Sequence, residues 1–408
     1  MKYLILIGDG MGDHPIAELG GRTPLQAAWT PAMDELSRKG SLLCASTVPN
    51  GYPPGSDVAN MSLLGYAPEK YYTGRAPLEA VSMGIPLAAD ETAFRCNLVT
   101  LDYQGNAQTA MVDFSAGHIS SYEASELIAA LQQRCGNEIF HFHAGISYRH
   151  LLVVKDPIPD MATVPPHDFI GKDVSSHYQT YLNTPGWREL LLEAKDVLTN
   201  HPVNRERIKN GQKPATGIWP WGNGKMPTMP TLPTRFAISG TMISAVDLLK
   251  GLGICVDLSV AHVEGATGYI DTNYAGKSEA ALDALTHQDF VFVHLEGPDE
   301  AGHQGNLGHK IQAIEDFDAK IVLPIITRLR EKNEPFRALI TMDHFTPLEL
   351  QTHTSEPVPV ILYDSREEDP GSLLPFDETL LKLHGDRLED IEGCKLINTL
   401  LQQPEKSK

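Results

Sequence analysis

Short apolar segments, three of which lead into acidic or histidine residues, are the feature that most constrains the fold of this chain. The first, at 2–7, leads into Gly-Asp-Gly, and similar segments lie at 235–238, 254–260, 290–295 and 338–342. We expect helices between them, at 241–252, 277–285 and 310–330. Alternating strands and helices are typical of a parallel sheet with helices on both faces. The pattern therefore predicts an α/β fold.

Two helices are predicted near the N-terminus. In the first, at 30–39, Thr30 can act as the cap and Pro31 can occupy the first helical position. The second begins after Pro-Pro-Gly and places Ser56 at or near its N-cap.

The middle of the chain has a different pattern, which predicts an inserted α+β domain. It contains strand-like segments at 94–101, 138–143 and 148–154, a helix at 121–134, and a Pro-rich stretch at 213–233 that we interpret as a return connection. A chain of 408 residues is long enough for two domains. We expect a core domain of residues 1–86 and 233–408, and an inserted domain of residues 87–232.

The composition of the chain excludes some classes of binding partner. The formal net charge of −19 argues against nucleic acid and gives no attraction to an anionic membrane. No stretch has the length of a membrane span, and the first residues resemble a buried strand more than a signal peptide. The five cysteines are odd in number and form no CxxC pair, which favours reduced thiols and a cytoplasmic protein.

Acidic and histidine residues at the strand ends predict a metal site. Asp299 and His303 are four residues apart, so a helix would place them on one face. Because the carboxyl ends of parallel strands meet at one edge, the other strand-end residues are expected nearby. Oxygen and imidazole ligands without thiolates suit Mn²⁺, Zn²⁺ or Mg²⁺. The candidate ligands are Asp9, Asp299, His303, Asp343, His344 and His353.

Ser56 is the candidate nucleophile. A serine hydroxyl needs a base or a metal to react at neutral pH, and a helix N-terminus favours negative charge. Two cations roughly 3.5–4 Å apart would stabilise both the entering and the leaving oxygen of a phosphoryl transfer. Taken alone, Ser56 fits a simple helix cap as well.

Taken together, these segments resemble the cofactor-independent phosphoglycerate mutases, specifically the archaeal-type branch within the alkaline phosphatase superfamily. The resemblance covers nearly the whole chain. The matching segments are GDGMGD at 8–13, TPLQAAWTPAMDELSRKG at 23–40, PPGSDVANMSLLGY at 53–66, YYTGRAPLEAVSMG at 71–84, AFRCNLVT at 93–100, GHIS at 117–120, SYRHLLV at 147–153, GATGYIDTNYAGK at 265–277, PDEAGHQGN at 298–306 and MDHFTP at 342–347.

The resemblance implies an alkaline phosphatase-like core, a small phosphorylated substrate and two divalent cations. Mn²⁺ is the expected ion, with Zn²⁺, Mg²⁺ or Co²⁺ as alternatives. It further implies that Ser56 is transiently phosphorylated while phosphate moves between the 3- and 2-hydroxyls of glycerate held in the inserted domain. One cation would be held by Asp299, His303 and His353. The other would be held by Asp9, Ser56, Asp343 and His344. The implied substrate contacts are Arg75, Arg95, His118, Arg149 and Lys277.

One segment departs from the family pattern. Where the archaeal mutases usually have an arginine, residues 217–225 contain Trp219 and Trp221, with Lys225 nearby. Arginine binds a carboxylate or phosphate group through two parallel hydrogen bonds. Because this arginine is missing, the sequence does not decide which compound accepts the phosphoryl group. A subgroup of the family with a similar segment has been proposed to phosphorylate homoserine in threonine biosynthesis.

A non-catalytic binding protein is a third hypothesis. It is disfavoured because every predicted metal-ligand position holds a residue type that can bind a metal. Whether identical chains assemble also stays open.

Two nucleotide-binding patterns are incomplete. The glycines at 8, 10 and 12 imitate a dinucleotide fingerprint, but its last glycine would fall on Asp13, whose charge would repel a pyrophosphate. The segment DTNYAGKS at 271–278 has Asp271 in place of the first P-loop glycine. Neither pattern predicts a nucleotide site.

Overall fold

The computed structural model describes residues 1–104, 108–155, 161–367, 374–383 and 390–402. The chain forms two compact units, one of Met1–Tyr72 with Thr228–Lys408 and one of Thr73–Pro227. The expected boundaries, after residue 86 and before residue 233, differ from these. The short helix α5 (Ala76–Ser82) packs against strands of the second unit, and the Thr73 hydroxyl donates to the carbonyl of Lys225, which ties the two ends of that unit together.

The first unit is built on a mainly parallel sheet. Over the described residues it has eight strands, in the order β13-β2-β12-β11-β1-β10-β8-β9. The strands are β1 (Lys2–Gly8), β2 (Ser41–Ser46), β8 (Gly240–Ile243), β9 (Ser259–Val260), β10 (Phe290–Leu295), β11 (Phe336–Thr341), β12 (Val358–Asp364) and β13 (Asp390–Glu392). β1 lies between β10 and β11 and is parallel to both, whereas β12 is antiparallel to β11 and β2. The predicted α/β fold with a mainly parallel sheet is confirmed.

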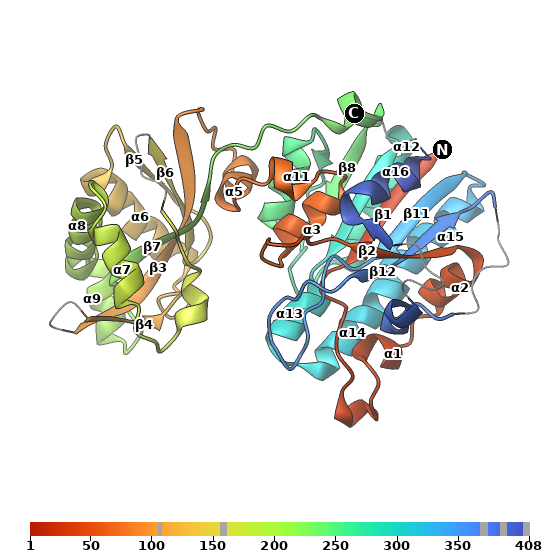
Figure 1. The fold of residues 1–408 in the computed structure, drawn as a ribbon. Coiled ribbons are helices and arrows are strands. Elements are labelled where there is room, and N and C mark those ends of the chain that lie inside the picture. The colour runs from red at the N-terminus through yellow and green to blue at the C-terminus, as the bar shows by residue number, and fades with distance from the viewer. Residues whose placement is uncertain (105–107, 156–160, 368–373, 384–389, 403–408) are drawn as a thin grey trace. The chain divides into compact units, whose positions relative to one another are not determined.

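Helices flank this sheet (Figure 1). α12 packs on β10 and β8, and α2 packs on β12 and β2. The α-helices of the unit are α1 (Pro24–Ala27), α2 (Pro31–Lys39), α3 (Ser56–Leu63), α4 (Pro68–Tyr71), α10 (Leu232–Phe236), α11 (Asp247–Cys255), α12 (Tyr274–His287), α13 (Gly297–His303), α14 (Leu307–Phe317), α15 (Leu323–Glu331) and α16 (Leu396–Leu401). Short 3₁₀ segments lie at Ala17–Leu19, Glu378–Leu383 and Gly393–Lys395.

The helix predicted at 30–39 is confirmed, with Pro31 in its first turn, but the Thr30 side chain makes no cap hydrogen bond. The helix predicted at 277–285 lies inside α12. The helix predicted at 310–330 is also confirmed, and a π-helical turn, Asp318–Val322, joins its two halves.

The strand predicted at 235–238 is wrong, because this segment ends helix α10. The Thr231 side chain accepts from the backbone N–H of Thr234, and Pro233 lies in the first turn, so a helix starts here. Ala237 adopts a left-handed conformation with φ 58° and closes it. The strand that we expected here follows instead as β8.

The next two predictions shift accordingly. The segment 241–252, predicted as a helix, starts in strand β8, and helix α11 begins only at Asp247. Of the strand predicted at 254–260, only Ser259–Val260 is extended, as β9. An apolar run that is buried on several sides cannot be assigned to helix or strand by its composition.

The second unit is an antiparallel sheet with helices. Its strands are β3 (Glu91–Gln104), β4 (Gln108–Asp113), β5 (Phe140–His143), β6 (Arg149–Lys155) and β7 (Gly217–Gly224), in the order β4-β3-β6-β5 with β7 also paired to β3. Its helices are α5, α6 (Ser121–Cys135), α7 (Ser175–Leu182), α8 (Trp187–Asn200) and α9 (Pro202–Lys209), with a 3₁₀ turn at Pro166–Phe169. The elements predicted at 94–101, 121–134, 138–143 and 148–154 correspond to β3, α6, β5 and β6.

The Pro-rich stretch at 213–233, predicted as a connection, contains strand β7. Pro220 lies opposite Cys96 of β3, and an edge strand tolerates a proline because its outer side needs no N–H donor. Trp219 is fully buried, and its indole N–H donates to the Val164 carbonyl at 2.9 Å. Among the described residues, no helix combines the length and apolar character that a membrane crossing requires.

Candidate active site

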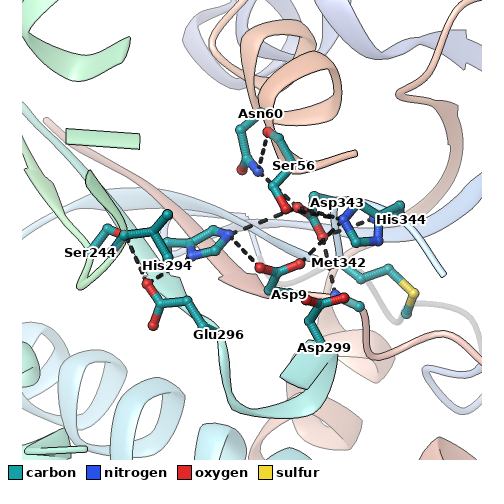
Figure 2. A network of polar contacts seen from close by, with 12 residues as sticks. Asp9, Ser56, Asn60, Ser244, His294, Glu296, Asp299, Met342, Asp343 and His344 are labelled. Atoms are coloured by element: carbon teal, nitrogen blue, oxygen red, sulfur yellow. Dashed lines mark hydrogen bonds and ion pairs between the residues drawn. The ribbon is translucent and has the colours of Figure 1, made fainter. Parts of the chain in front are cut away.

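The strand ends of the first unit bring the predicted ligands together. Asp9 follows β1, Asp343 and His344 follow β11, and Asp299 and His303 lie on α13, directly after β10. Because β1 lies between β10 and β11, these side chains meet at the carboxyl edge of three neighbouring strands. Figure 2 shows Asp9, Asp299, Asp343 and His344 around a common centre.

One group consists of Asp299, His303 and His353. The two carboxylate oxygens of Asp299 lie 3.3 Å from His303 Nε2 and 3.3 Å from His353 Nε2. The two Nε2 atoms are 2.9 Å apart. Thr346 donates its hydroxyl to Asp299 Oδ1 at 2.5 Å. The second ring nitrogens of His303 and His353 lie 2.9 and 3.3 Å from backbone carbonyl oxygens. If these nitrogens carry the proton, both Nε2 lone pairs are directed at one point.

A second group surrounds His344, whose ring is fully buried. Its Nε2 lies 3.2 Å from Ser56 Oγ, 3.4 Å from Asp9 Oδ1 and 3.5 Å from Asp343 Oδ2. Asp343 Oδ1 accepts from the backbone N–H groups of Gly10 and His344 at 3.1 and 2.9 Å. All seven residues named from the sequence are therefore neighbours. The two groups also adjoin, since ligand atoms of Asp299, His344 and His353 lie within 4.8 Å of one another.

His294 is the residue of this site that the sequence analysis missed. It lies inside β10, fully buried, and its Nε2 points at Asp9 Oδ2 (3.3 Å) and Asp343 Oδ2 (3.8 Å). The run FVFVHL reads as a uniformly apolar strand, and every residue in it is buried. The available signal was a histidine interrupting that run two residues before a glutamate.

Asn60 was also missed. It lies one turn beyond Ser56 on α3, fully buried, where its side-chain amide donates to the Ser56 carbonyl at 2.9 Å and to Asp343 Oδ2 at 2.8 Å (Figure 2). This fork couples the nucleophile helix to one of the candidate ligands.

Burial and crowding of carboxylates shift the pKa values here. Burial, then the charges of Asp343 and Asp299, raise the pKa of Asp9 well above its usual range. Burial lowers the pKa of His344 to about 4. Burial also opposes the charge of His303, but Asp299 outweighs it and raises the pKa of His303 to about 9. Burial also raises the pKa values of Asp299 and Asp343, but neighbouring histidines outweigh it and lower both, so Asp9 is the carboxylate that lacks positive charge.

The donor set fits divalent cations. Within the described part of the chain, the buried atoms Asp9 Oδ1 and His294 Nε2 have no hydrogen-bond partner. Buried polar atoms of this kind usually have a partner or hold an ion. The ligands are carboxylate oxygens and imidazole nitrogens, which suit Mn²⁺, Zn²⁺ or Mg²⁺.

The second unit gathers three of the predicted substrate contacts around one carboxylate. Glu79 of α5 accepts from Arg75 Nε at 3.2 Å and from Arg95 Nε at 3.0 Å. Burial raises the pKa of Glu79, but the charges of Arg95, Arg75 and Arg149 outweigh it and lower the pKa. The Arg95 guanidinium also lies 4.1 Å from the ring centre of Trp221, whose N–H donates to Asn97. Three cations around one anion leave a net positive cluster.

His118 lies on a strained turn. Ala116, Gly117 and His118 have consecutive positive φ values of 49°, 67° and 49°. The exposed His118 ring lies 6.2 Å from that of Tyr148, the residue before Arg149. Consecutive left-handed residues cost free energy and are often found at functional sites.

Lys277 does not fit the predicted role of substrate contact. It is fully buried in the first unit, and its ammonium donates to Glu296 at 2.9 Å and to the His294 carbonyl at 3.2 Å. A substrate has no access to this group. Lys277 lies in the first turn of α12, which packs on β10, so its motif match reflects a structural position.

Comparison with known proteins agrees with this fold and site. Residues 37–204 match the family model described as 2,3-bisphosphoglycerate-independent phosphoglycerate mutase. A protein of that name from Methanosarcina barkeri is 49% identical over 383 residues, covering 94% of this chain and 95% of the relative. Another from Methanothrix thermoacetophila is 48% identical over 402 residues, covering 98% and 100%. The solved cofactor-independent phosphoglycerate mutase of Thermoplasma acidophilum superposes with a TM-score of 0.62 at 28% identity, covering 98% and 99%.

An α/β enzyme with its polar residues at the carboxyl edge of a parallel sheet is the class that the fold and site define. Within that class, the chain belongs to the 2,3-bisphosphoglycerate-independent phosphoglycerate mutase family. The resemblance drawn from the sequence motifs is confirmed.

Proposed function

We propose that this chain interconverts 3-phosphoglycerate and 2-phosphoglycerate through a phosphoserine at Ser56, without 2,3-bisphosphoglycerate. The observation that carries the proposal is the position of Ser56 Oγ, at the first residue of α3 and 3.2 Å from His344 Nε2, beside buried carboxylates. The names of the relatives support the substrate. A role in glycolysis or gluconeogenesis, in the cytoplasm, belongs to the same proposal.

Two divalent cations, with Mn²⁺ as the expected ion, belong to the proposal. Asp299, His303 and His353 would hold one. Asp9, Asp343, His344 and Ser56 would hold the other. Bound there, the ions would supply positive charge that lowers the pKa of the serine hydroxyl and neutralises the phosphoryl oxygens.

The proposed reaction has two half-reactions that balance in atoms and charge. First, Ser56 Oγ attacks phosphorus, and the bond between phosphorus and the 3-oxygen of glycerate breaks. The serine loses its proton and the released 3-oxygen gains one. Then the 2-hydroxyl attacks the phosphoserine and restores the serine hydroxyl. No redox step occurs, and water must be excluded, or the phosphoserine would hydrolyse.

The chain's own residues prepare Ser56 for this attack. The N-terminus of α3 carries a partial positive charge that favours the alkoxide and the phosphorylated form. Asn60 fixes the Ser56 carbonyl and Asp343 together, so the hydroxyl keeps its place against the carboxylates. Correct positioning of the attacking atom is a large part of phosphoryl-transfer catalysis.

We further propose that the second unit, Thr73–Pro227, binds the substrate. Arg75, Arg95, Arg149 and His118 are the proposed contacts. Arginines recognise carboxylate and phosphate groups with paired donors, and the cluster around Glu79 keeps a net positive charge. We leave Lys277 out of this set because it is buried.

A second candidate acceptor is favoured by Trp221. Its indole covers one face of the Arg95 guanidinium in the strand β7, which holds the segment that departs from the family pattern. The alternative proposal is a phosphotransferase or kinase that acts on another hydroxyl compound, such as homoserine. Ser56 and both cations would serve it unchanged.

The test uses purified protein with Mn²⁺ and 3-phosphoglycerate, with 2-phosphoglycerate detected through enolase and no bisphosphoglycerate added. Turnover supports the mutase. No turnover, together with phosphorylation of homoserine by ATP, supports the alternative acceptor. Ser56→Ala should abolish transfer and the gain of one phosphoryl group in the protein mass. Ser62→Ala, at a buried serine of the same helix, is the control. Activity retained in Ser56→Ala excludes the phosphoserine route.

A further inference from the structure

We propose that His294 is an additional ligand of the cation held by Asp9 and Asp343, and that Glu296 and Lys277 orient it. The inference rests on the proposed two-cation function and adds a histidine from the interior of a strand to its ligand set. Figure 2 shows His294 between Glu296 on one side and Asp9 on the other.

The protonation of His294 follows from Glu296. Glu296 Oε1 accepts from the Ser244 hydroxyl at 2.7 Å and from the Ala245 N–H at 3.0 Å, and Oε2 accepts from Lys277 Nζ at 2.9 Å. The Lys277 ammonium and the Ala245 N–H can only be the donors in their contacts, so both oxygens of the Glu296 carboxyl act as acceptors. His294 Nδ1, 3.2 Å from Oε1, must donate its N–H.

The other ring nitrogen, Nε2, faces two carboxylates. His294 Nε2 lies 3.3 Å from Asp9 Oδ2 and 3.8 Å from Asp343 Oδ2, and one atom of each residue lies within 4.8 Å of the others. In the part of the chain that the structure describes, Nε2 has no hydrogen-bond partner. His294 and Asp343 are 0% exposed and Asp9 is 2% exposed, so water does not screen the contact. In this position Nε2 requires either a cation among the three atoms or a proton of its own.

The arrangement of Glu296, His294 and the carboxylates matches a general design of metal sites. A ligating histidine usually donates its second N–H to a carboxylate, which fixes the tautomer and makes the ring a better ligand. Here Glu296 is the carboxylate that accepts this N–H, and Lys277 holds the Glu296 side chain in position. This gives the fully buried Lys277 a role as a positioning residue, acting through two intermediates. The rival arrangement is an imidazolium, in which His294 itself supplies the positive charge between Asp9 and Asp343.

The two arrangements predict effects of opposite sign. Removing a ligand weakens the binding of the cation. Removing an imidazolium takes away a competing positive charge and tightens it. The chelated full-length protein should be titrated with Co²⁺ by calorimetry, with the visible absorption of the bound Co²⁺ as a second readout. Neither readout depends on activity.

For His294→Ala we expect one of two Co²⁺ dissociation constants to rise by at least about 100-fold, with a changed absorption spectrum. Glu296→Gln should raise the same constant by about 10–100-fold, the range for a partner of a ligating histidine. Glu296→Gln also serves if His294→Ala fails to fold. His287→Ala, an exposed histidine on α12, is the control and should leave both constants unchanged.

Two results overturn the inference: constants within twofold of the wild type in both variants with an unchanged spectrum, or tighter binding in His294→Ala. Neither result contradicts the proposed function, provided that the wild-type protein binds two ions. A wild-type protein that binds no Co²⁺ or Mn²⁺ refutes the proposed function together with the inference.

Discussion

Glu378 provides a direct test of the electrostatics beside the active site. It is 8% exposed, and its carboxylate accepts from the Asp13 N–H at 3.1 Å and from the Thr23 hydroxyl at 2.7 Å. Asp13 in turn binds the buried Lys310 ammonium at 2.8 Å, which also donates to the Thr346 carbonyl. Burial raises the pKa of Glu378 from 4.5 to about 7, because its two hydrogen bonds do not compensate for the lost water.

The raised pKa means that folding favours the protonated form of Glu378. Its stabilising contribution is complete below pH 4.5 and is lost as the pH rises through about 7. A shift of about 2.5 pKa units at 1.36 kcal/mol each corresponds to roughly 3 kcal/mol. Glu378→Gln keeps the acceptor for Asp13 but cannot ionise, so it escapes this loss.

We therefore expect Glu378→Gln to be near wild-type stability at pH 4.5 and more stable by up to about 3 kcal/mol at pH 8. The free energy of unfolding of the wild type and of Glu378→Gln is measured by denaturant titration between pH 4.5 and 8, with a chelator present. Hydrogen exchange in the first unit serves as the readout of unfolding. Subtracting the two curves removes every other titrating group. Glu349→Gln, at an exposed glutamate, is the control for the loss of one carboxyl group. A difference for Glu378→Gln that is flat or falls with pH would refute the reasoning.

Three further predictions concern activity. Asn60→Ala should lower kcat by about 10–100-fold, because the hydrogen bond from Asn60 to the charged Asp343 contributes about 1.5–3 kcal/mol. An unchanged kcat would show that Asn60 does not position Ser56. Arg207→Lys should raise KM with little change in kcat. Arg207 donates to the Ala116 carbonyl and to Glu123, and it thereby holds the turn that carries His118. Steady-state kinetics measure KM and kcat separately. Chelation should inactivate the wild type and added Mn²⁺ should restore it, while full activity after verified metal removal would exclude the proposed cations.

The residues that could be predicted share one property: they follow a strand. Asp9 and Asp343 stand directly after apolar runs, and the carboxyl-edge rule of parallel sheets places such residues together without any knowledge of the loops. His353 lies on no such strand end, and it became a candidate because it follows Asp343 and His344 in the chain. The rule concerns strand ends only.

His294 and Lys277 show where this reasoning stops. A strand that is buried on both faces gives no alternation, so a histidine within it looks like any core residue. Lys277 was assigned to the substrate because it matches a motif of the family, and only the structure reveals its buried partner Glu296. Register between distant strands, such as Ile7 beside His294, is set by packing that no local pattern encodes.

The crowding of buried carboxylates at one sheet edge has a consequence for folding as well as for chemistry. Asp9, Asp299 and Asp343 come from three neighbouring strand ends, and burial together with the charges of Asp343 and Asp299 raises the pKa of Asp9 there. Any ion that binds only the folded form stabilises it by about 2.7 kcal/mol when present at 100 times its dissociation constant. The proposed cations would therefore stabilise the first unit as well as act in the chemistry, and a ligand from the interior of a central strand, as proposed for His294, would link that stabilisation directly to the core of the sheet.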